Sequence, residues 1–152
     1  LMLRVLGPAA AVSAIGKHFA NDEVDFEDFV AIRLTFANGG LGSFVSVQWD
    51  HIGKNSAEVF LEKGTIYYDS VSRAVYLAAD GQECQSIPYA NIHPEWENGV
   101  YREMREFAEA CLGEGPITIP GEDGLRAVEL AQAAYTSLRE GRTVPLPLPA
   151  EP

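Results

Sequence analysis

Two segments of the sequence combine aromatic rings with short hydrogen-bonding groups, a mixture suited to binding a sugar ring. The first is Trp49-Asp50-His51-Ile52-Gly53-Lys54-Asn55, and the second is Tyr89-Ala90-Asn91-Ile92-His93-Pro94-Glu95-Trp96. One follows a predicted strand and the other precedes a predicted helix, and loops on a rigid sheet are where binding sites are usually built. The alternative is that the tryptophans pack at a rim or interface and the histidines are surface residues. For His51, burial as a neutral packing residue against helices is a further alternative.

The sequence lacks the motifs of a self-contained enzyme. The glycine run Gly39-Gly40-Leu41-Gly42 falls in a predicted hairpin, whereas a dinucleotide site needs such a run between a strand and a helix. There is no Gly-x-Ser-x-Gly nucleophile turn, and His18, His51 and His93 are too far apart in sequence to predict a metal site. We therefore assign no catalytic, cofactor-binding or metal-binding residue to this chain.

A cluster of acidic residues precedes one predicted strand, formed by Asp22, Glu23, Asp25, Glu27 and Asp28. We interpret it as a solvated loop leading into that strand, because runs of like charge usually face solvent. Binding of a substrate or a cation is the alternative.

The composition is that of a globular domain, with 152 residues of which 47% are hydrophobic and 22% charged. A formal net charge of −11 should repel nucleic acids and anionic membrane surfaces. We find no apolar run that could span a bilayer and no signal peptide. Cys84 and Cys111 form no Cys-x-x-Cys pair, so we expect reduced, partly buried thiols in a cytoplasmic protein. The first residues resemble the end of a helix stopped by Gly7 and Pro8, and we expect a segment upstream.

The hydrophobic pattern predicts strands first and helices afterwards. Alternation indicates strands at residues 30–36, 41–49, 57–62, 65–68, 74–77 and 83–87. A helical stripe follows, formed by Val100, Met104, Phe107, Ala108 and Cys111, and a second is formed by Leu125, Val128, Ala131, Tyr135 and Leu138. This order predicts an α+β fold, an open and mostly antiparallel sheet of about six or seven strands with helices packed on one face.

One face of that sheet should remain open. We expect Leu41, Val45, Val47 and Trp49 to pack inward, and the open face to carry Phe44, Phe60 and Tyr68. Such a face is too apolar to stay in water over a large area. We therefore expect two chains to pack sheet to sheet with two-fold symmetry, giving a homodimer or tetramer.

The order of several segments resembles the glucose–fructose oxidoreductase and inositol dehydrogenase family, known as Gfo/Idh/MocA. The resemblance is carried by four stretches, 29–39 with 41–43, 58–66, 101–107, and Pro120-Gly121-Glu122-Asp123-Gly124-Leu125-Arg126-Ala127 running on to 137–141. It covers nearly the whole chain, and it implies that residues 1–152 are the C-terminal substrate-side and oligomerisation domain of a larger enzyme.

The resemblance further implies an N-terminal Rossmann domain that binds NAD or NADP, and hydride transfer to or from a sugar, inositol or related polyol. The family's glycine fingerprint, its Glu-Lys-Pro segment and its Asp-x-x-x-His pair are absent here, so we expect them upstream of Leu1. What remains for this chain is substrate binding, for which the candidates are Trp49, His51, Asn55, His93, Trp96 and Tyr101.

Two other functions stay open at this point. The chain could be a free-standing ligand-binding or oligomerisation module without chemistry. It could also belong to relatives of the family that use the nicotinamide transiently for hydrolysis or elimination.

Overall fold

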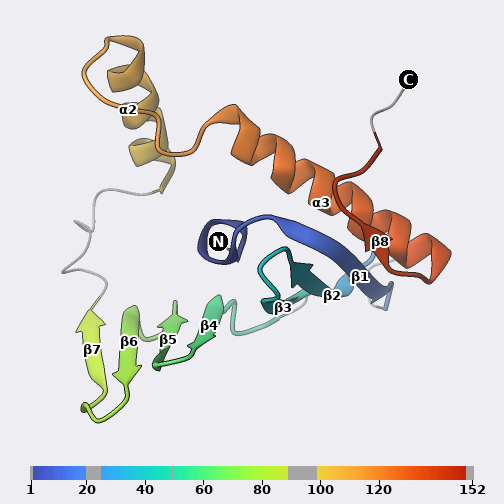
Figure 1. Ribbon diagram of the computed structural model, residues 1–152, viewed down its shortest axis with the longest axis horizontal. Coiled ribbons are helices and arrows are strands. Elements are labelled where there is room, and N and C mark those ends of the chain that lie inside the picture. The colour runs from blue at the N-terminus through green and yellow to red at the C-terminus, as the bar shows by residue number, and fades with distance from the viewer. Residues whose placement is uncertain (1, 20–24, 49, 89–98, 150–152) are drawn as a thin grey trace. The chain divides into compact units, whose positions relative to one another are not determined.

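The computed structural model describes residues 2–19, 25–48, 50–88 and 99–149. The chain divides into two compact units, the first comprising Leu1–Trp49 and Ile119–Pro152 and the second Asp50–Thr118. Each unit has its own four-stranded antiparallel sheet (Figure 1).

The first unit contains α1 (Met2–Leu6), β1 (Ala9–Lys17), β2 (Phe29–Phe36), β3 (Leu41–Val47), α3 (Gly121–Glu140) and β8 (Val144–Pro145). Its strands lie in the order β3-β2-β1-β8. The turn predicted at Asn38-Gly39 joins β2 to β3, with φ of 86° at Gly39. Asn38 Oδ1 accepts a hydrogen bond of 2.9 Å from the backbone N–H of Gly40. Glycine tolerates positive φ without strain, so the turn residues fix this hairpin.

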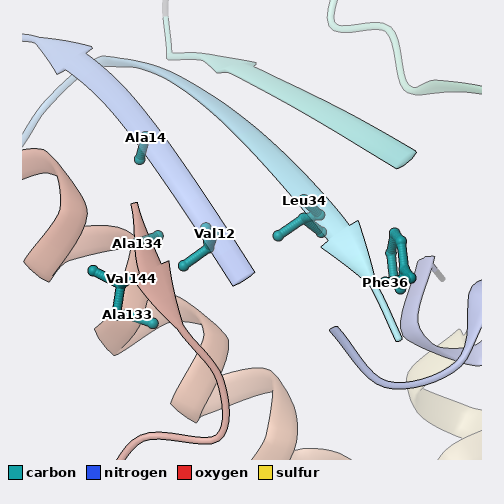
Figure 2. Packing of buried hydrophobic residues seen from close by; sticks show 7 residues of the cluster. All are labelled: Val12, Ala14, Leu34, Phe36, Ala133, Ala134 and Val144. Atoms are coloured by element: carbon teal, nitrogen blue, oxygen red, sulfur yellow. The ribbon is translucent and has the colours of Figure 1, made fainter. Parts of the chain in front are cut away.

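The core of the first unit lies between its sheet and α3 (Figure 2). The buried apolar residues come from β1, β2, α3 and β8, and they are Val12, Ala14, Leu34, Phe36, Ala133, Ala134 and Val144. Gly16 on β1 marks a close approach, because a Cβ there would lie 2.8 Å from Leu138 Cδ1. Small residues on both elements therefore let the helix lie directly against the strand.

The buried side of α3 differs from the predicted stripe. Leu125, Val128 and Tyr135 are exposed, whereas the buried positions of the helix are Ala133, Ala134 and Ser137. The prediction assumed that the large apolar side chains of α3 would be buried. Because the helix lies close to β1, the small side chains face the sheet instead.

The predicted orientation of β3 is wrong. Leu34, which is buried beneath α3, pairs with Gly42, and Ile32 pairs with Phe44. Residues that pair across a sheet point to the same face, so Phe44 lies on the α3 side and Leu41 and Val45 lie on the open side. Both faces of β3 carry apolar residues, and alternation alone cannot choose between them.

Ser137 ties α3 to the sheet. Its hydroxyl oxygen accepts a hydrogen bond of 2.9 Å from the backbone N–H of Ala14 on β1. The same hydroxyl donates to the carbonyl oxygen of Arg142 at 2.6 Å, just beyond the Gly141 cap of the helix. Ser137 is buried, so no water can replace these two bonds.

We predict that Ser137→Ala lowers the free energy of unfolding by about 1–3 kcal/mol, because it leaves the N–H of Ala14 buried without a partner. Urea unfolding followed by circular dichroism measures this difference. Gln132→Ala on the exposed side of α3 is the control and should change the free energy by less than about 0.5 kcal/mol. Equal stability of the two variants would contradict the role given to Ser137.

The second unit contains β4 (Ser56–Leu61), β5 (Gly64–Asp69), β6 (Ala74–Ala79), β7 (Gln85–Pro88) and α2 (Gly99–Cys111). Its strands follow one another in the order β4-β5-β6-β7, as short connections predict. Phe60 pairs with Thr65 and Tyr68 pairs with Ala57. Thr65 and Tyr68 alternate across β5, so Phe60 and Tyr68 lie on opposite faces, and the predicted open face shared by these two residues is wrong.

Helix α2 covers the residues predicted to be helical, but it buries none of them. All members of its predicted apolar stripe are exposed, namely Val100, Met104, Phe107, Ala108 and Cys111.

The predicted α+β class with antiparallel strands is confirmed. The strands divide between two sheets of four, whereas the sequence suggested one sheet of six or seven. Helix α3 packs on one face of the first sheet, as expected of an open sheet with helices. Among the described helices, none is both long and apolar enough to cross a membrane.

Candidate functional site

Of the six candidate substrate residues, three lie among the described residues and three do not. Trp49, His93 and Trp96 lie outside the described residues. His51 and Asn55 lie together in the loop that precedes β4, and Tyr101 lies in the first turn of α2. His51 and Asn55, two of the six candidates, thus belong to one segment, residues 50–55, which we call the 50–55 loop.

The backbone of the 50–55 loop is held at both ends. At its start, the Asp50 carboxylate accepts a hydrogen bond of 2.9 Å from the N–H of Ile52, and the N–H of Gly53 donates to the Asp50 carbonyl at 3.2 Å. Gly53 has φ of 63°, which glycine adopts without strain. This turn leaves the side chain of His51 exposed in the second unit, so His51 is not buried there.

At the other end of the loop, Asn55 pairs with the turn between β5 and β6. The N–H of Asn55 donates to Ser70 Oγ at 2.7 Å, and the N–H of Ser70 donates to the Asn55 carbonyl at 2.9 Å. Both hydrogen bonds use backbone atoms of Asn55, and Asn55 is exposed. The amide side chain can therefore present both a donor and an acceptor to a hydroxyl-rich ligand.

Two carboxylates near this loop are stabilised in their charged form. The backbone N–H of Ile52 lowers the pKa of Asp50, with a smaller contribution from Lys54. The hydroxyl of Ser72 and the N–H of Val71 lower the pKa of Asp69. Both groups are therefore ionised at neutral pH, and they act as hydrogen-bond acceptors that shape the two turns.

The sequence analysis did not predict that the turn between β5 and β6 holds the 50–55 loop in place. Asp69 accepts hydrogen bonds from the N–H groups of Val71 at 3.0 Å and Ser72 at 3.1 Å, which fixes the turn that carries Ser70. The signal was present, because aspartate followed by serines is a turn-forming pattern in which side chains bond to nearby backbone. Ser70 and Asp69 thus position the 50–55 loop from a neighbouring hairpin.

Tyr101 has a separate environment on α2. Its ring is partly exposed, and the guanidinium carbon of Arg105, one turn later, lies 6.0 Å from the ring centroid. Further along the same helix, the Glu106 carboxylate accepts a hydrogen bond from the N–H of Thr118, which lowers the pKa of Glu106. The guanidinium of Arg105 thus lies over the ring of Tyr101 in a cation–π contact within the helix.

The acidic cluster before β2 is not simply a solvated loop. Asp28 is 2% exposed, and its carboxylate accepts a hydrogen bond of 2.8 Å from the N–H of Phe19. His18 Nδ1 lies 2.9 Å from the carbonyl oxygen of Phe26. The interpretation fails for Asp28, which holds the chain leaving β1. Asp25 is exposed, and Asp22 and Glu23 lie outside the described residues.

Neither a metal site nor a phosphate loop is found in the described part of the chain. Among those residues, no three His, Cys, Asp or Glu side chains are grouped so that they could hold a metal ion. The N–H groups of Gly39 and Gly40 donate to the Phe36 carbonyl and to Asn38 Oδ1. These donors close a β-hairpin and are not directed at a ligand, so this glycine run does not fit a dinucleotide.

Comparison with known proteins identifies relatives of the chain. Residues 2–146 match the model of an oxidoreductase family, in the part described as its C-terminal alpha/beta domain. Myo-inositol 2-dehydrogenase from Thermotoga maritima is 30% identical over 121 residues, which cover 78% of this chain and 36% of that protein.

Solved structures share the fold at lower identity. The WlbA dehydrogenase from Chromobacterium violaceum, solved with NADH and UDP-GlcNAcA, gives a TM-score of 0.80 at 22% identity, covering 99% of this chain and 44% of that one. Levoglucosan dehydrogenase in complex with NADH and levoglucosan gives 0.81 at 19% identity, covering 97% and 47%. The chain thus spans less than half the length of each of these relatives.

Proposed function

The chain belongs to the Gfo/Idh/MocA oxidoreductase family, as its resemblance predicted, and from this premise we propose that it is the substrate-binding and oligomerisation domain of a larger dehydrogenase. That enzyme would transfer a hydride between NAD or NADP and a sugar, inositol or related polyol. The match to the family's C-terminal domain over residues 2–146 carries the proposal. An N-terminal Rossmann domain would supply the cofactor site and the acid–base residues.

The relatives support the proposed substrate class. The curated relative is named for myo-inositol, and solved neighbours hold levoglucosan or a nucleotide sugar. These ligands share rings that carry several hydroxyl groups. The 50–55 loop offers an imidazole and an amide, which can donate to and accept from such groups.

Within this enzyme, the chain contributes binding groups and the partner domain contributes the redox centre. A bound nicotinamide supplies the hydride acceptor or donor. His51 and Asn55 would orient the substrate, and Ser70 would hold their loop in place through the two bonds with the backbone of Asn55. Trp49, His93, Trp96 and Tyr101 are proposed as the aromatic and polar remainder of the same substrate site.

We predict that His51→Ala, in the complete two-domain enzyme, raises KM or lowers kcat/KM by about tenfold or more. One or two hydrogen bonds to the substrate would be lost, each contributing about 1–1.5 kcal/mol. His51 is exposed, so the melting temperature should change by less than about one degree. Steady-state kinetics and thermal unfolding measure the two effects separately.

Two further variants complete this experiment. His51→Gln keeps a hydrogen-bonding side chain and should recover part of the loss. Gln82→Ala lies on the exposed turn between β6 and β7 and should behave as the unsubstituted enzyme. A lower melting temperature with unchanged kinetics for His51→Ala would make His51 a packing residue and remove it from the proposed site.

The proposed oligomerisation rests on the open face of the first sheet, opposite α3. This face is formed by Ala11, Ser13, Ile15, Lys17, Phe29, Ala31, Arg33, Thr35, Leu41, Ser43, Val45 and Val47. Ile15, Leu41 and Val45 are more than half exposed. The face contains no acidic residue, although the chain has 22 of them. Depletion of one charge sign beside exposed apolar side chains is typical of an interface, and we propose that two chains meet here.

We also propose a cytoplasmic location. Cys84 and Cys111 form no disulfide in the described structure, which suits a reducing compartment. Both are exposed, so the prediction that they are partly buried is wrong.

A further inference from the structure

The charged residues around the 50–55 loop bear on the kind of ligand that this loop can hold. The loop contains Asp50 and Lys54, and the β5–β6 turn that supports it contains Asp69 and Arg73. Both segments belong to the second unit, and two hydrogen bonds join them. An anionic ligand would need unpaired cations or free backbone N–H groups on these segments.

The carboxylate of Asp50 fills the position at which the 50–55 loop could otherwise bind an anion. It accepts a hydrogen bond of 2.9 Å from the N–H of Ile52. The N–H of Ile52, and to a smaller extent those of Lys54 and Gly53, lower the pKa of Asp50. Successive N–H groups of this kind form the concave sites in which proteins bind phosphate or carboxylate groups. Here a carboxylate of the chain itself already uses them.

The carboxylate of Asp69 does the same in the β5–β6 turn. It accepts hydrogen bonds from the N–H groups of Val71 at 3.0 Å and Ser72 at 3.1 Å. The hydroxyl of Ser72 and the N–H of Val71 lower the pKa of Asp69, so this carboxylate is ionised at neutral pH. The N–H of Ser70 donates to the carbonyl oxygen of Asn55 at 2.9 Å. The N–H groups of these three turn residues are therefore directed at acceptors within the chain.

The two cations of these segments are also engaged. After the hydrogen bonds already described, the positive charge of Lys54 is a further cause of the low pKa of both Asp50 and Asp69. One ammonium group thus lies near two carboxylates. Arg73, at the end of the turn, has an interaction partner of its own. A ligand that approaches residues 50–55 and 69–73 therefore meets two fixed negative charges and no cation without a partner.

We propose that the substrate held by the 50–55 loop is an uncharged sugar or polyol, and that Asp50 and Asp69 disfavour sugar acids, sugar phosphates and nucleotide sugars. The side chains left for the ligand are the imidazole of His51 and the amide of Asn55, which exchange hydrogen bonds with hydroxyl groups. The inference rests on the proposed function, and it narrows the substrate class within it.

The test compares matched ligands in the longer protein that contains both domains. D-glucose is paired with D-glucuronate, and myo-inositol with myo-inositol 1-phosphate, so that the members of each pair differ by one anionic group. We expect kcat/KM to be about tenfold or more higher for the neutral member at low ionic strength, and the ratio to shrink as salt screens the carboxylates. Calorimetric titration in the presence of the cofactor gives the same comparison without turnover.

Two isosteric variants assign the preference to the proposed charges. Asp50→Asn removes a charge and keeps an oxygen that can accept from the N–H of Ile52, so the turn can persist. It should favour the anionic member of each pair by about threefold or more, relative to the neutral member. Asp69→Asn provides a second variant if the first disturbs the loop. Asp80→Asn removes the same charge at the opposite end of the β5–β6 hairpin and should leave the ratio unchanged.

The possible outcomes separate this inference from the proposed function. Equal use of both members, a preference for the anionic member, or equal effects of Asp50→Asn and Asp80→Asn would overturn the inference and leave a functioning dehydrogenase. Binding of the neutral members without oxidation would support the inference and contradict the dehydrogenase proposal. Absence of both binding and oxidation for every ligand would contradict both.

Discussion

Replacing Val45 by glutamate is expected to convert the proposed oligomer into monomers. Val45 is 59% exposed and lies between Ser43 and Val47 on the open face of the first sheet. Across a two-fold axis, the new carboxylate would be buried in an apolar contact, and two copies of it would be brought together. Burying an unpaired charge in this way costs several kcal/mol, so the dimer dissociation constant should rise by about a hundredfold or more.

Sedimentation velocity at tens of micromolar measures this change. The unsubstituted protein should sediment as a dimer or tetramer and Val45→Glu as a monomer, with the same far-ultraviolet circular dichroism. Gln132→Glu adds the same charge on the exposed side of α3, away from the sheet, and should leave the assembly intact. A strict monomer for the unsubstituted protein, or an unchanged mass for Val45→Glu, would contradict the proposed interface.

The choice of Val45 depends on the structure, because the sequence pointed to Phe44. Period-two alternation identified β3 correctly, but a strand with apolar residues on both faces does not reveal which face is buried. The deciding information is long-range. Gly42 pairs with buried Leu34, and this register is set by the β2–β3 turn together with the packing of α3.

Turn residues and hydrophobic periodicity predicted the structure correctly where a single turn or a single element is concerned. The Asn38-Gly39 turn, the Lys63-Gly64 connection and both long helices could be predicted from the sequence. The division into two sheets could not, because short connections fix which strands pair but do not show where a sheet ends. The buried face of α3 was missed for a related reason, since Ala133, Ala134 and Ser137 carry little hydrophobicity and are selected by closeness to β1.

The candidate site was predicted less completely than the fold. The sequence identified the 50–55 loop from its residue types, and the structure adds the hairpin that holds it, through Asp69 and Ser70. The hydrogen bonds between Asn55 and Ser70 could not be predicted from the sequence, because these two residues come together only when β4 pairs with β5. Likewise, the sequence did not show that Asp28 is buried, because the hydrogen bond that its carboxylate accepts from the N–H of Phe19 joins residues nine positions apart.

The 152-residue chain alone is expected to bind neither NAD nor NADP at millimolar concentration and to show no dehydrogenase activity. A dinucleotide is held by free backbone N–H groups at a glycine-rich turn that opens a helix. Here the N–H groups of Gly39 and Gly40 are engaged within the β2–β3 turn. The formal charge of −11 also opposes approach of a pyrophosphate.

Titration calorimetry of the chain with each cofactor tests this expectation, with the longer protein as the matched control. The longer protein should bind one of the two cofactors in the micromolar range and oxidise a polyol. Hydride transfer requires the nicotinamide to be held about 3–3.5 Å from the substrate carbon, and in our proposal the two-domain enzyme would provide that geometry. Saturable binding to the isolated chain tighter than about 100 μM would show that it contains a cofactor site of its own. If the longer protein also binds neither cofactor, the dehydrogenase proposal itself fails, and a ligand-binding module without redox chemistry becomes the better account of this fold.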